Sequence, residues 1–138
     1  MATNLYLLDT NYLLRSLVSG EKKQVAEVEL LFENARKGRC KLFVIPEIIL
    51  EVEYVLRKVY RFDRESVGND LSSIVNTDFV TVDNEDNVRI AIDIYRMVNV
   101  DLVDIFLFLA SKERGMGIKT FDKDFAKIQK VYNKLTQV

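Results

Sequence analysis

The sequence contains no histidine, one cysteine and one proline among its 138 residues. Without histidine, the chain lacks the usual general base, the Ser-His-Asp and Cys-His triads, and the commonest zinc ligand. Its five glycines match neither a dinucleotide-binding fingerprint nor a Walker phosphate-binding loop. Catalysis, if there is any, must therefore rest mainly on carboxylates, of which there are 21.

Other absences predict where the protein works. A single cysteine, Cys40, cannot form an internal disulfide, and the N-terminus lacks the basic and then apolar pattern of a secretory signal. The longest apolar run, residues 105–110, is far shorter than the roughly twenty residues that cross a bilayer. We therefore expect a soluble, cytoplasmic protein with no membrane partner. The net charge of −1 predicts no general affinity for nucleic acid, so such binding would need a local patch.

The composition is typical of one compact domain spanning residues 1–138, with 49% hydrophobic and 30% charged residues. Continuous apolar runs predict buried strands, whereas a spacing of three and four residues predicts helices. Their alternation predicts a three-layer α/β/α fold with a mainly parallel central sheet. We expect strands at 4–8, 42–45, 79–82 and 118–121. We expect one helix capped by Thr10 or Asn11 that runs to 17, and one capped by Asp83 or Asn84 that runs to about 98. We expect further helices at 22–37, 46–59, 64–75, 102–113 and 123–128, with the C-terminal tail a candidate edge strand.

Two acids follow strands at the edge where open parallel sheets bind ligands. Asp9 comes directly after the first expected strand, before a helix that Thr10 or Asn11 would cap. Asp122 follows the fourth, within TFDKDF. Each also has a structural interpretation, Asp9 as a turn or cap residue, and Asp122 as the cap of a short helix with Asp124 near the same N-terminus.

Two further acids lie on apolar helices. Asp104, in DLVDIFLFLA, would need a partner or a cation, because an isolated buried carboxylate costs several kcal/mol. Alternatively, Asp101 is an N-cap and Asp104 completes a capping box at a solvated end. Glu51 borders the apolar stripe of the helix after Pro46, whereas Glu47 and Glu53 lie farther around it. Glu51 could equally be a solvated surface residue.

These four acids come from separate segments and can converge on one crevice. Carboxylates gathered without histidine repel one another unless a cation neutralises them, and their hard oxygens suit Mg²⁺ or Mn²⁺. Such a site suits metal-assisted hydrolysis of a phosphodiester.

The motifs that carry these acids resemble those of the PIN domain (PilT N-terminus-like) nucleases, most closely the VapC-like toxins of toxin–antitoxin pairs. LLDTNYLLRSL, LEVEYVL, DLVDIFLFLA and TFDKDF resemble the four family motifs in order. The resemblance implies a Mg²⁺- or Mn²⁺-dependent endoribonuclease that uses water as the nucleophile. It implies metal ligands at Asp9, Asp104 and Asp122, a ligand or water-orienting group at Glu51, and supporting roles for Asn11, Thr120, Asp101 and Asp124. Either Asp122 or Asp124 fits as the fourth acid.

The resemblance also implies an RNA substrate, a homodimer and an antitoxin partner. Lys119 and Lys123 flank the expected crevice and are the favoured RNA contacts. Two other basic clusters are Arg36, Lys37, Arg39 and Lys41, and Arg57, Lys58, Arg61 and Arg64, although each cluster could simply be a solvated face. Apolar side chains such as Tyr12, Leu17 and Tyr54 could form the antitoxin groove, or they could pack in the core.

Three alternatives remain. A phosphatase of the haloacid dehalogenase type also has an Asp after its first strand, but it needs a second Asp two residues on, where this chain has Asn11. A phospho-receiver domain needs an additional acidic pair near the first strand, which residues 1–8 lack. A catalytically inactive PIN-like scaffold would bind RNA or protein, but would have no reason to keep four like charges.

Overall fold

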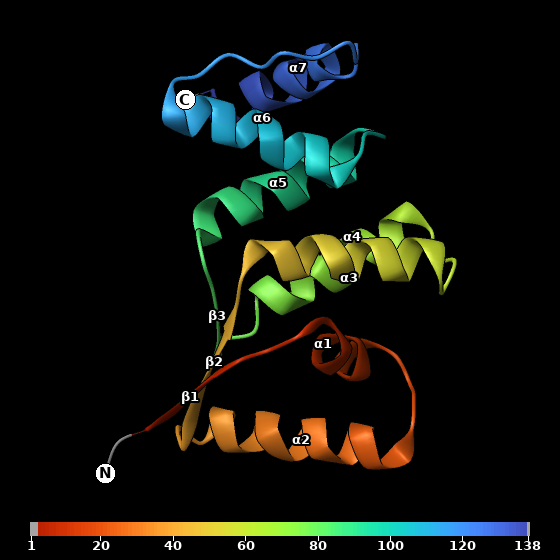
Figure 1. Ribbon diagram of the computed structural model, residues 1–138, viewed down its shortest axis with the longest axis vertical. Coiled ribbons are helices and arrows are strands. Elements are labelled where there is room, and N and C mark those ends of the chain that lie inside the picture. Colours follow the sequence, from red (N-terminus) through yellow and green to blue (C-terminus); the bar gives the residue numbers. More distant parts are fainter. Residues whose placement is uncertain (1–2, 138) are drawn as a thin grey trace. The chain divides into compact units, whose positions relative to one another are not determined.

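The computed structural model describes residues 3–137, which fall into two compact units. The first unit ends at Glu85 and the second begins at Asp86. The first unit contains a parallel sheet of three strands, β1 (Asn4–Leu7), β2 (Cys40–Val44) and β3 (Val80–Val82), in the order β1-β2-β3 (Figure 1). Parallel pairing brings the carboxyl ends of neighbouring strands to one edge, where the candidate acids of this unit are attached.

Burial differs between β1 and the other two strands. Leu42 and Val44 of the central β2 are 0% exposed, and Val80 and Val82 of the edge strand β3 are also buried. In β1, the other edge strand, Leu5 and Leu7 are 63% and 71% exposed and only the following Leu8 is buried. The expectation that the first strand is buried is therefore wrong, because a continuous apolar run does not show whether other elements cover the strand.

Four helices complete the first unit, namely α1 (Thr10–Leu17), α2 (Lys22–Arg36), α3 (Pro46–Lys58) and α4 (Arg64–Val75). α1 packs against α2 and α3, and α3 packs against α4 (Figure 1). Pro46 occupies the first turn of α3, as predicted, where its missing N–H is not needed. Gly38 follows α2 with a φ of +77°, a conformation in which glycine commonly ends a helix.

The second unit consists of three helices, α5 (Glu85–Met97), α6 (Leu102–Arg114) and α7 (Phe125–Thr136). α6 and α7 lie side by side, and the rings of Phe108 and Tyr132 meet edge to face with centroids 5.2 Å apart. Gly115 ends α6 in the left-handed conformation, with a φ of +64°.

Two expectations about the C-terminal third are wrong. Residues 118–121 form no strand, and Phe121 is fully exposed. The residues Ile118, Thr120 and Phe121 are of types common in strands, but the segment is only four residues long and pairs with no described strand. The tail does not form an edge strand either, because α7 continues to Thr136 with Ile128 buried. No helix within residues 3–137 is both long enough and apolar enough to cross a membrane.

Candidate functional site

Asp9 occupies the N-cap of α1, one residue beyond the buried Leu8. Its Oδ1 atom accepts a hydrogen bond of 3.0 Å from the backbone N–H of Tyr12. The prediction that Thr10 or Asn11 caps this helix is wrong, since α1 begins at Thr10. The side chain of Asp9 is exposed, and Oδ2 makes no hydrogen bond to a described residue. One oxygen thus orients the carboxylate while the other is available to a ligand.

Glu51 lies on α3, which begins two residues after β2. Because β1 and β2 are neighbouring parallel strands, α3 and Asp9 start from the same edge of the sheet. The Glu51 side chain is exposed. Glu51 is thus a solvated group, five residues into a helix that starts at this edge.

Glu53 is a buried acid whose position sequence reasoning missed. It is only 4% exposed, and it forms an ion pair of 2.6 Å with Arg57, one turn along α3. Glu53 lies four residues after Ile49, which is fully buried, so it falls on the apolar stripe and not farther around the helix. The spacing of Ile49, Glu53 and Arg57 was the available signal for a paired structural acid.

Asp104 lies in the first turn of α6 and is partly buried. Burial raises its pKa above the ordinary range, and the negative charges of Asp101, Asp122 and Asp124 raise it further. It forms no ion pair with a described residue. Asp101 occupies the N-cap position but makes no side-chain capping bond, so the capping box considered as an alternative does not form. The second unit therefore brings together the four aspartates that the sequence singled out in its half of the chain.

The loop before α7 distinguishes Asp122 from Asp124. The Thr120 hydroxyl accepts from the Asp122 backbone N–H at 2.9 Å, and Oδ1 of Asp122 accepts from the Asp124 N–H at 2.9 Å. The Asp124 carboxylate instead pairs with Lys127 at 3.3 Å. Asp124 is thus already partly neutralised, whereas Asp122 is held in a turn supported by Thr120 and is the stronger influence on the pKa of Asp104.

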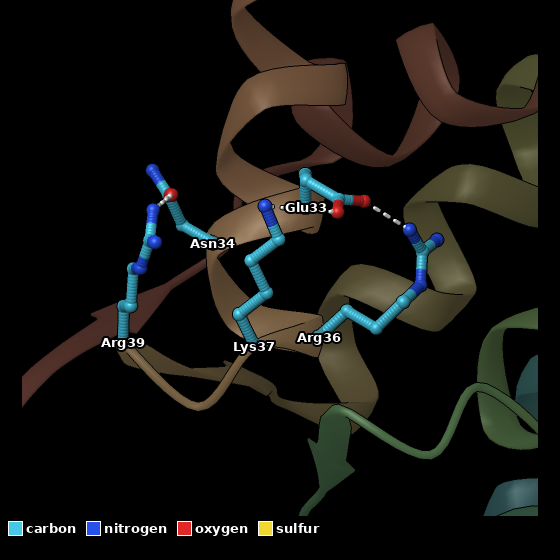
Figure 2. A network of polar contacts seen from close by, with 5 residues as sticks. All are labelled: Glu33, Asn34, Arg36, Lys37 and Arg39. Carbon is cyan, nitrogen blue, oxygen red and sulfur yellow. Dashed lines mark hydrogen bonds and ion pairs between the residues drawn. The ribbon is translucent and has the colours of Figure 1, made fainter.

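The basic cluster around Arg36 is already occupied by contacts within its own unit. Glu33 forms ion pairs with both Arg36 and Lys37, and Arg39 donates to Asn34 at 3.3 Å (Figure 2). These residues precede β2, so they belong to the amino edge of the sheet, opposite the edge at which Asp9 lies. This placement does not favour them as contacts for the phosphate at the acids. Lys119 and Lys123, close to Asp122 in the chain, are exposed and form no ion pair with a described residue.

The donor atoms at these positions suit a hard divalent cation, because they are carboxylate oxygens. Beside Asp9, the buried Thr10 hydroxyl lacks a hydrogen-bond partner among the described residues. Because buried hydroxyls are normally hydrogen-bonded, a further polar atom is expected next to it. Within either unit, as far as it is described, no three His, Cys, Asp or Glu side chains form a group that could hold a metal ion alone.

The class of protein follows from the parallel sheet, its helices and the four acidic motifs in their order along the chain. The sequence model of the PIN domain matches residues 6–131, a range that includes all four candidate acids. The chain therefore belongs to the PIN domain family, which confirms both the resemblance and the predicted α/β/α fold class.

One relative is named for its activity. The chain is 33% identical over 123 residues to a VapC ribonuclease from Aquifex aeolicus (strain VF5), an alignment that covers 88% of this chain and 90% of that protein. No solved structure matches the chain at a significant level.

Proposed function

We propose that this chain is a divalent-metal-dependent endoribonuclease and the toxin of a toxin–antitoxin pair. The observation that carries the proposal is Asp104, a partly buried carboxylate without a cationic partner among the described residues, whose pKa is raised by burial and further by three neighbouring aspartates. Such a cluster of like charges is unfavourable unless a cation joins it. Membership of the PIN family and similarity to a VapC ribonuclease support RNA as the substrate.

In this proposal the catalytic set draws on both units. Asp9, Asp104 and Asp122 are the metal ligands, and Glu51 is a further ligand or orients the attacking water. Bound Mg²⁺ or Mn²⁺ would supply the Lewis acidity that activates water for attack on phosphorus. The Tyr12 N–H fixes the Asp9 carboxylate, and Thr120 supports the turn that carries Asp122.

The remaining residues have supporting roles. Asp101 adds negative charge beside Asp104, and Asp124 supports the same loop through its N–H bond to Asp122. Asn11 borders Asp9 and is available to substrate, since its side chain makes no hydrogen bond to a described residue. Lys119 and Lys123 contact RNA phosphates. The family resemblance further supports an antitoxin partner, a homodimer and a cytoplasmic location.

The test is cleavage of single-stranded RNA by the purified protein with Mg²⁺ or Mn²⁺, and again with EDTA. We expect chelation, Asp9→Asn and Asp104→Asn each to reduce the rate by at least about 100-fold, because even the outer partners of metal ligands contribute about 10- to 100-fold. Asn caps helices about as well as Asp, so Asp9→Asn removes the charge and keeps α1.

Matched controls are Asp78→Asn in the first unit and Asp93→Asn in the second. Both aspartates are exposed and lie outside the four motifs. These variants should cleave like the wild type. Cleavage that persists in EDTA, or in either ligand variant, would contradict the mechanism. Absence of any cleavage by the wild type would favour the inactive scaffold.

A further inference from the structure

A hollow of about 290 Å³ lies beside Asp9, between the start of α1 and α2. It is lined mainly by polar side chains, which are Asp9, Asn11, Tyr12, Arg15, Gln24 and Glu27, with Val28 as the apolar contact. Its volume is near the lower end of the range for small-molecule sites, about 300–1,000 Å³. The hollow is therefore large enough for one small planar ligand next to a proposed catalytic carboxylate.

Arg15 is held in this hollow by three neighbours. Its Nε atom donates to Gln24 at 2.9 Å, and Nη1 donates to the Tyr60 hydroxyl at 3.3 Å. Gly20 passes so close that a Cβ atom there would lie 2.5 Å from Nε. The guanidinium is thus positioned before any ligand arrives, and its Nη2 group makes no hydrogen bond to a described residue.

Glu27 provides an acceptor in the same hollow. The Tyr12 hydroxyl donates to its Oε2 atom and joins α1 to α2, while Oε1 remains available. Glu27 forms no ion pair with a described residue, although Arg15 lines the same hollow. The site therefore offers a positioned donor group and a positioned acceptor, together with the aromatic ring of Tyr12.

We propose that this hollow binds the base of the RNA nucleotide next to the cleaved bond, with a preference for guanine. The inference rests on the proposed ribonuclease function. Asp9 and Glu27 disfavour an anionic occupant, whereas a base is neutral and planar. Guanine offers an acceptor, O6 or N7, to the unoccupied Nη2 group of Arg15, and N–H donors that Oε1 of Glu27 can accept. Tyr12 offers a surface for stacking.

The first test is cleavage of an RNA pool of random sequence with Mg²⁺, followed by sequencing of the ends. We expect the wild type to favour guanine at one position adjacent to the cut. Glu27→Ala and Arg15→Lys should each reduce that preference by about 5- to 150-fold, the discrimination typical of one good base contact. Both variants should change the same RNA position, and cleavage should still depend on Mg²⁺ and Asp9.

Glu29→Ala is the matched control, because Glu29 is exposed on the same helix and lies outside the hollow. It should leave the preference unchanged. A wild type with no base preference beside the cut would overturn the inference. So would a Glu27→Ala variant that keeps the wild-type preference, even though the proposed function would stand in both cases.

A binding measurement keeps the inference testable without cleavage. Guanosine and adenosine are neutral and carry the same ribose, so titrating each into the wild-type protein isolates the effect of the base. We expect guanosine to shift the backbone NMR signals of Gln24 and Glu27 more strongly than adenosine does, and Glu27→Ala to remove the difference. Equal responses to both nucleosides, or none to either, would contradict a guanine subsite.

Discussion

At the scale of single residues, Asp104 is subject to opposing influences. A carboxylate in the first turn of a helix is favoured by the helix dipole, typically by about 0.3–1 kcal/mol. Burial and three neighbouring aspartates oppose ionisation, and the raised pKa of Asp104 shows that this opposition is stronger. The ionised group therefore costs stability in the folded protein when no metal is present.

This cost predicts the pH dependence of Asp104→Asn. With the pKa raised in the folded state, the native protein holds the proton more tightly than the unfolded chain, so stability falls as pH rises through that raised pKa. The variant lacks this loss. In EDTA, the melting temperature of Asp104→Asn should equal or exceed that of the wild type at pH 7, and the difference should shrink toward pH 4. A lower melting temperature for the variant at pH 7 would indicate a favourable contact of the carboxylate.

The residue scale also shows what the sequence could not distinguish. The sequence correctly placed Asp9 after a strand and offered it as a cap residue, but could not decide between Asp9, Thr10 and Asn11 as the cap of α1. Cap identity depends on which residue leaves helical backbone first, and Asp, Thr and Asn are all acceptable there. Glu51 and Glu53 differ by only two positions, and here the sequence did carry a signal, because Glu53 follows the buried Ile49 by four residues on the same face of α3.

At the scale of elements, the strong periodic segments were predictable and the short ones were not. The helix expected at 64–75 matches α4 in both bounds, because its apolar spacing is regular and Asp63 supplies a cap. Residues 118–121 failed as a strand, since four residues carry little periodicity and a strand needs a partner. α7 was underestimated although Phe125, Ile128, Tyr132 and Leu135 stand at helical spacing, so the sequence carried a signal for the longer helix.

The packing of α7 on α6 can be tested through its aromatic pair. Tyr132→Ala removes the edge-to-face contact with Phe108, a kind of contact that contributes about 0.5–1.5 kcal/mol beyond surface burial. Phe108 is 4% exposed, so Phe108→Ala should cost about 3–5 kcal/mol. Urea unfolding measures both. Tyr132→Phe keeps the ring and should stay within about 0.5 kcal/mol of the wild type. A Tyr132→Ala variant as stable as the wild type would contradict this packing.

At the scale of the whole molecule, the proposed chemistry joins acids from the two units. The first unit presents Asp9 and Glu51 from neighbouring strand ends, and the second presents Asp104 beside Asp122. The order of the four motifs in the sequence was enough to assign these acids to one family pattern. The PIN match, which covers both units, agrees with that assignment. Their action as one catalytic set is the central claim.

The most direct test of this claim is Mn²⁺ binding, measured by electron paramagnetic resonance in the wild type, Asp9→Asn, Asp104→Asn and the double variant, with Asp93→Asn as control. If both acids hold the same ion, each single change should weaken binding by at least about 10-fold. The double variant should lose less than the product of the two single losses, because residues that share a partner are not additive. Wild-type affinity in either single variant, or losses that simply multiply, would contradict a shared metal site.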